Sequence, residues 1–555
     1  MIESSYLTYK PPKEWLNGLK IKTIYPPIPR KTAEVDFDIY DFEMLFNDKP
    51  TIDLIRSGKT IGCFYIESPG MRSLLRRLDV HTFEMLTAAS SIIRPGVAES
   101  GMMQEFIARH KDPSRRKYFI PEMGELLAET YGIMIYQEDV IKVAHFIAGL
   151  SFEEADLLRR AMSGKMRSHD AMRKIEGNFF ASCKRKGYTD AQTKELWRQI
   201  ESFAGYSFCK AHSASFALLS YQVAFLKAHY PAEFLAAVLS NGGGFYSAAV
   251  YVWEAVRCGL KVKLPSINHS MYEYTGSGNE IRIGLMAIKN LSAKTIHKIV
   301  EERKLHGEYK SLADFLVRTK TGFEESSILI KCGAMGCLKK TRPTLLRLLD
   351  IYIHKRKLLE ENYNDLFVSE SFALENEVDT QQNFSLEEIC KQEYEAFGYM
   401  VTRHPLHFYK KYIDDKSITK AVEMPQKKGK YAKMIGWYMT SKRIKTRSGE
   451  IMKFLSLEDL TGTFEAVIFP KVYHQYAELT SSMGPYVVEG IIDENDHTNL
   501  IVKKLSVLSL QIVKSDFEKD SVENTYLGDV EKIPEEDFRL AEKLNQEKLR
   551  RAYLG

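Results

Sequence analysis

The chain has 555 residues, of which 44% are hydrophobic and 27% are charged, and its net charge is +5. Since a single hydrophobic core stops growing at about 250 to 300 residues, a chain of this length should contain several domains. No apolar stretch approaches the roughly 20 residues of a membrane-spanning helix, and the first residues fit neither an export signal nor a transit peptide. We therefore expect a cytoplasmic protein, and so small a net charge does not by itself indicate a nucleic-acid partner.

The apolar spacing is mostly helical from about residue 40 to residue 240. Ser151 followed by Glu154 predicts a capping box at the start of one helix. Pro231 predicts the first turn of another helix. Residues 245–345 mix short strands with helices, and a polar, acidic stretch at about 369–388 indicates a linker.

From about residue 431 the apolar period changes to two, which is typical of strands. Turn signals separate the runs, which cover residues 433–444, 451–460, 463–470, 486–493 and 499–508. Strands of this number and length favour a barrel of the OB type. The charged tail that follows lacks a strong period.

The cysteines give no framework for a metal or a disulfide. There are seven, and the close pair Cys332 and Cys337 has no second Cys or His pair at zinc-site spacing. We expect free thiols and no metal site.

Long runs of the sequence resemble the alpha subunit family of bacterial replicative DNA polymerase III, the family-C polymerases, in family order. These runs are TIGCFYIESPGMRSLLRRL (60–78), SSIIRPGVAESGMMQEFI (90–107), YGIMIYQEDVIKVAHFIAGLSFEEADLLRRAMSGK (131–165), FAGYSFCKAHSASFALLSYQVAFLKAHYPAEFLAAVLS (203–240), GYMVTRHPL (398–406) and FLSLEDLTGTFEAVIFP (454–470). The resemblance implies a multidomain, mainly α chain with a helical fingers domain, a helix-hairpin-helix region and a C-terminal OB-fold β-barrel. The expected domains are an irregular lead-in (1–40), fingers (41–245), the helix-hairpin-helix region (246–350), a connector (351–430), the OB-fold (431–510) and a charged tail (511–555).

In this family the fingers hold the incoming nucleoside triphosphate and the templating base. Cations cluster at one predicted helix and its exit, where they could meet a triphosphate. A charge run of this kind is more often a solvated helix face, and it is the resemblance that favours the nucleotide. The nucleotide-binding residues that we expect are Arg94, Arg159, Arg160, Lys165, Lys210 and His212. For Arg94 a phosphate and a structural carboxylate are equally good partners. Lys210 and His212 precede a predicted helix, at whose start Ser213 and Ser215 could act as caps or meet an anion.

The other partners implied by the resemblance are DNA and the sliding clamp. The stretch from Arg282 resembles the tandem helix-hairpin-helix element that holds duplex phosphates, but Asn290-Leu291-Ser292 replaces its usual Gly-x-Gly hairpin. On the barrel a basic and aromatic face should bind single-stranded DNA, and its candidate residues are Trp437, Tyr438, Lys442, Arg443 and Lys445. Residues 362–367, NYNDLF, resemble a clamp-binding peptide with Leu366 and Phe367 as anchors, or they simply end a helix.

Family-C polymerases join nucleotides with Mg²⁺ ions held by palm aspartates. The family places these acids upstream of the run at residue 60, where VDFDIYDF puts Asp36, Asp38 and Asp41 close together. The spacing to the fingers is too short and a third acid on a separate strand is missing, so we expect Asp36 and Asp38 to be solvated rather than catalytic. The palm carboxylates then come from a partner or a missing N-terminal half.

The sequence therefore predicts a DNA-directed DNA polymerase, a nucleotidyltransferase of DNA replication. Its part is to bind primer-template, single-stranded DNA and deoxynucleoside triphosphates. One alternative is a compact polymerase that uses Asp36 and Asp38. The other is a non-catalytic DNA-binding subunit of a split polymerase, or an inactive relic. The sequence does not choose between a split gene, a truncated gene and a partial record.

Overall fold

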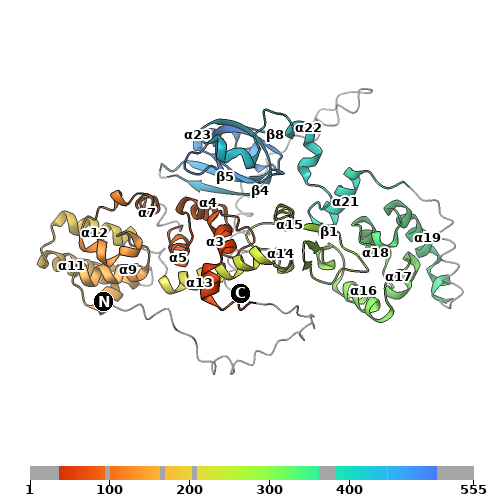
Figure 1. Cartoon of the computed structure of the whole chain (residues 1–555), viewed down its shortest axis with the longest axis horizontal. Coiled ribbons are helices and arrows are strands. Elements are labelled where there is room, and N and C mark those ends of the chain that lie inside the picture. Colours follow the sequence, from red (N-terminus) through yellow and green to blue (C-terminus); the bar gives the residue numbers. More distant parts are fainter. Residues whose placement is uncertain are drawn as a thin grey trace, which may run out of the picture.

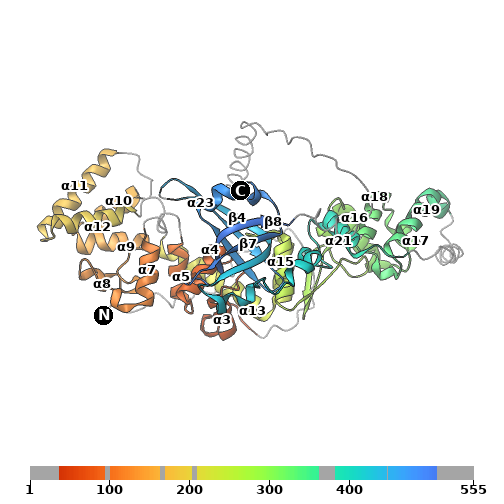
Figure 2. The same cartoon turned by 90° about the horizontal axis from the view of Figure 1, so that it is seen from above.

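The computed structural model of this chain describes residues 37–93, 101–162, 169–202, 209–361, 382–446 and 448–508. The helical segments form a row of three lobes, and a β-barrel lies over the middle lobe (Figure 1). A view turned by 90° shows the same row, with the barrel again over the middle (Figure 2). In the described ranges no helix is both long and apolar enough to cross a membrane.

The middle lobe is built around one long helix, α13 (Lys210–His229), which packs against α3 and α5. Its buried side chains include Tyr221, Ala224 and Phe225. The other helices of this lobe are α2 (Phe42–Asn47), α3 (Lys49–Arg56), α4 (Pro69–Leu78), α5 (Phe83–Ile92), α14 (Pro231–Ser240) and α15 (Ala248–Arg257). Pro231 opens α14, as the sequence predicted, because proline fits the first turn of a helix, where its missing N–H leaves no bond unmade.

The second lobe is helical throughout its described part. It contains α7 (Met102–Lys111), η2 (Pro113–Arg115), α8 (Glu122–Leu126), η3 (Ala128–Thr130), α9 (Gln137–Lys142), η4 (Val143–Ile147), α10 (Phe152–Met162), α11 (His169–Arg185) and α12 (Asp190–Ser202). The capping box predicted at α10 is confirmed. Ser151 Oγ accepts from the Glu154 amide, and Glu154 Oε2 accepts from the Ser151 amide.

The third lobe combines a small sheet with helices, as its mixed pattern predicted. The strands β1 (Lys261–Lys263), β2 (Thr275–Ser277) and β3 (Glu280–Arg282) pair in the order β1-β3-β2. The helical elements are η5 (Leu285–Ala287), α16 (Ala293–His306), α17 (Leu312–Thr319), α18 (Phe323–Lys331), η6 (Gly336–Leu338), α19 (Arg342–Glu361) and α21 (Leu386–Phe397). The linker predicted at 369–388 is therefore too long at its C-terminal end. Ser385 accepts from the Glu388 amide and caps α21 inside that range.

The barrel closes in the strand order β4-β5-β6-β8-β7. Its strands are β4 (Tyr431–Lys445), β5 (Ile451–Glu458), β6 (Thr463–Ile468), β7 (Tyr486–Ile492) and β8 (Asn499–Val507), with α23 (Pro470–Tyr476) and η9 (Leu479–Ser481) between β6 and β7. β4 pairs with β7 through residues 431–436 and with β5 through residues 437–445, so one long strand joins both sides. Alternate apolar side chains such as Met434, Leu455 and Val488 fill the interior. The predicted mainly α chain with a C-terminal OB-type barrel is confirmed.

A connector of short helices leads from α21 to the barrel. It consists of η7 (Pro405–Tyr409), α22 (Lys410–Ile413) and η8 (Ala421–Lys427). Leu406 of η7 packs with Ile435 and Val487 against the outside of the barrel. All seven cysteines lie in the described ranges and are free thiols, as expected.

Candidate nucleotide and nucleic-acid interfaces

Arg159 lies where α10 meets α9. Its Nε donates to Asp156 Oδ1 at 2.8 Å, and its Nη1 donates to Gln137 Oε1 at 3.0 Å. Arg160 Nε pairs with the other carboxylate oxygen of Asp156 at 2.7 Å. These ion pairs are partly or largely exposed, so they stabilise the fold by no more than about 1 kcal/mol each and can be exchanged for another anion.

Lys210 reaches the same turn from the first residue of α13. Its Nζ lies 2.6 Å from Glu129 Oε2, and its backbone amide donates to Glu138 Oε2 at 2.9 Å. The structure thus brings Lys210 and Arg159 to neighbouring residues of α9, Glu138 and Gln137. A negatively charged ligand at this turn would compete with carboxylates that already hold these cations.

His212 lies inside α13, because the helix begins at Lys210 and not after His212 as the sequence indicated. Its ring packs on Phe216 with centroids 4.4 Å apart. Ser213, which the sequence placed at the helix start, is buried and accepts a hydrogen bond from Ser91 Oγ at 2.8 Å. Arg94 and Lys165 lie outside the described residues, so their nucleotide role stays a prediction.

Asp139, which the sequence analysis did not single out, orders the turn before α9. Its carboxylate is buried and accepts from the Ile135 and Tyr136 amides, both at 2.9 Å. Burial raises the pKa of Asp139 to about 6. An acid three residues after a turn residue at a helix start is the signal that could have revealed it.

Two of the acids in VDFDIYDF, Asp38 and Asp41, lie in the described residues and form no metal site there. Asp38 is exposed in a turn, where its Oδ1 accepts from the Tyr40 amide. Asp41 caps α2 by accepting from the Met44 amide. Asp36 lies outside the described residues. No group of three or more His, Cys, Asp or Glu side chains with metal-site geometry occurs in the described part of the chain.

The barrel face predicted to bind DNA divides into two parts. Lys442, Arg443 and Lys445 are exposed where β4 pairs with the start of β5. Trp437 and Tyr438 are both partly buried, and they pack on different sides: Trp437 against the connector and Tyr438 against the barrel core. The cations are therefore free to meet a phosphate backbone, whereas each ring already has apolar neighbours.

The hairpin of the third lobe carries its own anion. Asn290 adopts φ 61°, the left-handed conformation that glycine or asparagine takes most readily. The Ser292 amide donates to Glu325 Oε1 at 2.9 Å, and Thr295 Oγ1 donates to Glu325 Oε2 at 2.7 Å. A carboxylate from α18 thus occupies the amide that such a hairpin offers to a phosphate.

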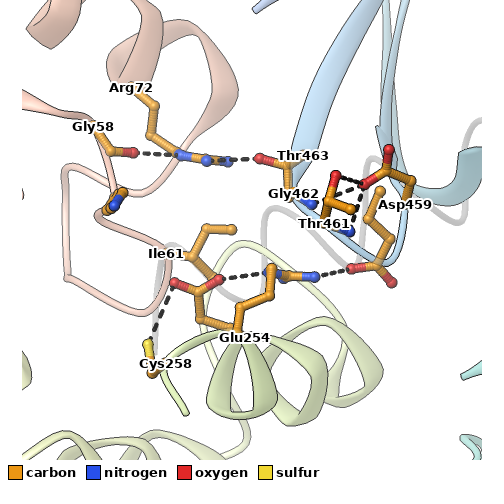
Figure 3. Close-up of polar contacts among 12 residues, drawn as sticks. Gly58, Ile61, Arg72, Glu254, Cys258, Asp459, Thr461, Gly462 and Thr463 are labelled. Carbon is orange, nitrogen blue, oxygen red and sulfur yellow. Dashed lines mark hydrogen bonds and ion pairs between the residues drawn. The ribbon is translucent and has the colours of Figure 1, made fainter. Parts of the chain in front are cut away.

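Polar contacts hold the barrel on the middle lobe, and no sequence pattern predicts them. Arg72 of α4 lies between the two parts, with Nε donating to Gly58 O at 2.8 Å and Nη2 to Thr463 Oγ1 at 2.9 Å (Figure 3). Asp459 accepts from the Thr461 and Gly462 amides and so fixes the turn that carries Thr463 (Figure 3). The barrel is therefore held by hydrogen bonds from α4.

A second contact comes from α15. Arg257 Nη1 pairs with the buried Glu458 of β5 at 2.7 Å, and its Nε pairs with Glu254 at 3.1 Å. His404 completes this contact. Its Nδ1 accepts from the Leu406 amide, so the proton is on Nε2, which donates to Glu458 Oε1 at 3.2 Å. The negative charge of Glu458 and the positive charge of Arg257 therefore neutralise each other between the barrel and α15.

Residues 362–381 lie outside the described ranges, and with them Leu366 and Phe367. The proposed clamp-binding peptide therefore stays a prediction, as do the domain boundaries drawn from the sequence.

Comparisons with known proteins agree with this architecture. The family model described as the bacterial DNA polymerase III alpha subunit finger domain matches residues 22–187, and the helix-hairpin-helix motif matches residues 259–345.

Three similar proteins are all named DNA polymerase III subunit alpha. The DNA polymerase III subunit alpha of Aquifex aeolicus is 34% identical over 84% of this chain and 40% of the relative. The protein of the same name from Staphylococcus aureus is 31% identical over 86% of this chain and 44% of the relative. The one from Borreliella burgdorferi is 32% identical over 88% of this chain and 44% of the relative. The chain thus spans less than half the length of these relatives. Over most of its own length the chain is similar to one region of bacterial DNA polymerase III alpha subunits, and this part of the chain contains the finger-domain match and the helix-hairpin-helix match.

Proposed function

We propose that this chain holds the primer-template and the incoming nucleotide of a replicative DNA-directed DNA polymerase. The observation that carries the proposal is the match to DNA polymerase III alpha subunits over more than four-fifths of the chain, including a finger domain. The ligands would be DNA and deoxynucleoside triphosphates, in the bacterial cytoplasm. A sliding clamp would engage Leu366 and Phe367.

The nucleotide would bind where Arg159 and Lys210 approach the first turn of α9. Both cations are held by carboxylates at 2.6 to 2.8 Å, and a triphosphate supplies stronger acceptors of the same kind. Arg94, Arg160, Lys165 and His212 would complete the set. Binding would then release Asp156 of α10 and Glu129 of η3 from their ion pairs, and both segments would move when the nucleotide binds.

The reaction itself needs groups beyond these. Phosphoryl transfer by such enzymes uses Mg²⁺ ions that stabilise the attacking and leaving oxygens. The described residues of this chain do not fit the ions, because Asp38 accepts from its own turn and Asp41 caps a helix. We therefore propose that the metal-holding carboxylates lie elsewhere in the polymerase, and that this chain alone binds its ligands without extending a primer.

The test is primer extension with Mg²⁺ by the chain alone and after addition of a palm-containing polymerase partner. We expect extension with the partner and none without it. Arg159→Ala should then raise the nucleotide concentration needed for half-maximal extension by about ten-fold, since a charge-assisted contact is lost. Arg198→Ala is the matched control, because Arg198 is an exposed arginine paired with Glu195 on α12. Robust extension by the chain alone, abolished by Asp36→Asn with Asp38→Asn, would contradict the proposal.

A second candidate is a DNA-binding subunit without any part in nucleotide selection. The exposed cations Lys442, Arg443 and Lys445 would serve such a protein equally well. The two functions separate in the same assay. A pure DNA-binding subunit would leave nucleotide use unchanged in Arg159→Ala while DNA binding persists.

A further inference from the structure

A cleft separates the C-terminal ends of two helices from one end of the barrel. Its volume is about 500 Å³, and its walls come from α4, α7, the segment before β4 and the turn between β7 and β8. None of the residues assigned above to the nucleotide or to DNA lines it. Two helical lobes and the barrel therefore face the same space.

The cleft carries a surplus of positive charge. Its acids already have partners, because Asp496 pairs with Arg76 at 3.3 Å and Asp79 pairs with Arg56. Three further cations line the cleft, Arg77 from α4, Lys111 from α7 and Lys428 from the barrel side. Within the described ranges none of these three has an ion pair, and Arg77 Nε is buried without a hydrogen-bond partner. Because these three cations have no acid partner in the described ranges, the cleft keeps an excess of positive charge that favours an anion.

Two imidazoles lie on opposite walls of the cleft. His110 comes from α7 and His497 from the turn between β7 and β8. Burial lowers the pKa of both histidines, so at neutral pH they are uncharged. The positive charge of the cleft at pH 7 therefore comes from Arg77, Lys111 and Lys428.

We propose that this cleft is a phosphate-binding site that bridges the helical lobes and the barrel. Arg77 and Lys111 would hold the phosphate from one wall, and Lys428 would hold it from the other. Guanidinium and ammonium groups converging on one space match the several acceptor oxygens of a phosphate group. The source of the phosphate is either a free polyphosphate or the backbone of a single-stranded nucleic acid, which share this chemistry.

Bridging has a structural consequence. The contacts of Arg72 and Arg257 with the barrel are polar. A ligand that binds both walls stabilises the described arrangement of the barrel and the helical lobes relative to any other arrangement. The gain in stability equals the difference in its binding free energy between the two arrangements. Phosphate binding should therefore fix the barrel on the helical lobes. The proposal does not depend on polymerase activity.

The test is calorimetric titration of the full chain with sodium tripolyphosphate and, separately, with a dT oligonucleotide. We expect Lys111→Ala and Lys428→Ala each to weaken the binding of at least one of these two titrants by about five-fold or more. Both lysines are exposed, so the variants should fold. Lys503→Ala is the matched control, because Lys503 is an exposed lysine on β8 away from the cleft. Loss confined to one titrant identifies the source of the phosphate.

Hydrogen exchange then tests the bridge. The bound titrant should slow exchange both in the turn 493–498 and at the C-terminal ends of α4 and α7. At the same titrant concentration, Lys428→Ala should reduce the protection on both walls. The proposal is overturned if neither titrant binds, if both bind all variants equally, or if protection appears on one wall only. These outcomes are independent of primer extension, so failure of the site and failure of the proposed function are distinguishable.

Discussion

Lys227 and Glu254 form a buried ion pair with 2.7 Å between Nζ and Oε1, and the side chains are 2% and 9% exposed. The same Nζ donates to the carbonyl oxygens of Lys59 and Ile61, so all three of its protons are used. Burial opposes both charges, but the pair outweighs it, raising the pKa of Lys227 and lowering that of Glu254 to about 2. Glu254 also holds Arg257, which reaches the barrel. This ion pair thus links the loop after α3 to the contact between α15 and the barrel.

Lys227→Met should destabilise the chain by about 3 to 5 kcal/mol, because it leaves Glu254 buried beside a single remaining cation. Adding Glu254→Gln to that variant should recover part of the loss, since the orphaned charge is then gone. The measurement is chemical or thermal unfolding of each variant. Lys59→Met is the matched control, as Lys59 is exposed and contributes only its carbonyl. Equal effects of the two methionine variants would contradict a special role for the buried pair.

Glu465 of β6, which lies where the barrel meets α4, should make the stability of the chain depend on pH. Burial raises its pKa to about 7, and Asp496, Arg72 and Arg76 are the charged groups that act on it. Because the folded pKa exceeds the ordinary value of 4.5, the folded chain keeps a proton that the unfolded chain releases. Stability therefore falls as the pH rises from about 4.5 to about 7.

Glu465→Gln should remove this loss, with an upper bound on the order of 3 kcal/mol at pH 8 and almost no effect at pH 4.5. The check is the difference in Tm between variant and parent across that range. Glu450→Gln serves as the control, since Glu450 is an exposed acid in the turn before β5. A Tm difference that does not change with pH would show that folding does not raise the pKa of Glu465.

Replacing Lys442, Arg443 and Lys445 together by alanine should weaken binding of single-stranded DNA. Three lost phosphate contacts should also lower the slope of log affinity against log salt by about 2. Titration of a labelled dT oligonucleotide at several salt concentrations measures both effects. The control replaces Lys471, Lys503 and Lys504, which are exposed elsewhere on the barrel and carry the same charge. An unchanged slope in the first variant, or equal loss in the two, would exclude this surface.

The elements were predictable because their signals are local. Ser151 with Glu154, and Pro231, mark helix starts through contacts made within a few residues. The period of two after residue 431 likewise reflects the alternation of side chains across each barrel strand. The start of α13 was misplaced because Ser213 is a typical cap residue, but its hydroxyl is used by Ser91, which is 122 residues away in the chain.

The contacts between distant segments left no such signal. Arg72 meets Thr463, and Arg257 meets Glu458, only after the barrel is placed on α4 and α15. Charged side chains of this kind are usually exposed, so nothing local distinguishes them from a solvated helix face. The same holds for the nucleotide candidates, since the ion pairs of Arg159 and Lys210 depend on how α9, α10 and α13 meet.

Glu325 offers a test of the hairpin in the third lobe. Its carboxylate accepts from the Ser292 amide and from Thr295, where a phosphate would otherwise bind. Glu325→Ala frees that amide and removes a negative charge, so binding of duplex DNA should strengthen by about three- to ten-fold, with a salt slope larger by up to about 1. Glu324→Ala is the matched control, because it removes the same charge from the adjacent, exposed position of α18. A gain shared by both variants would reflect net charge alone, whereas a gain in Glu325→Ala only would show that an internal carboxylate competes with DNA for the hairpin amide.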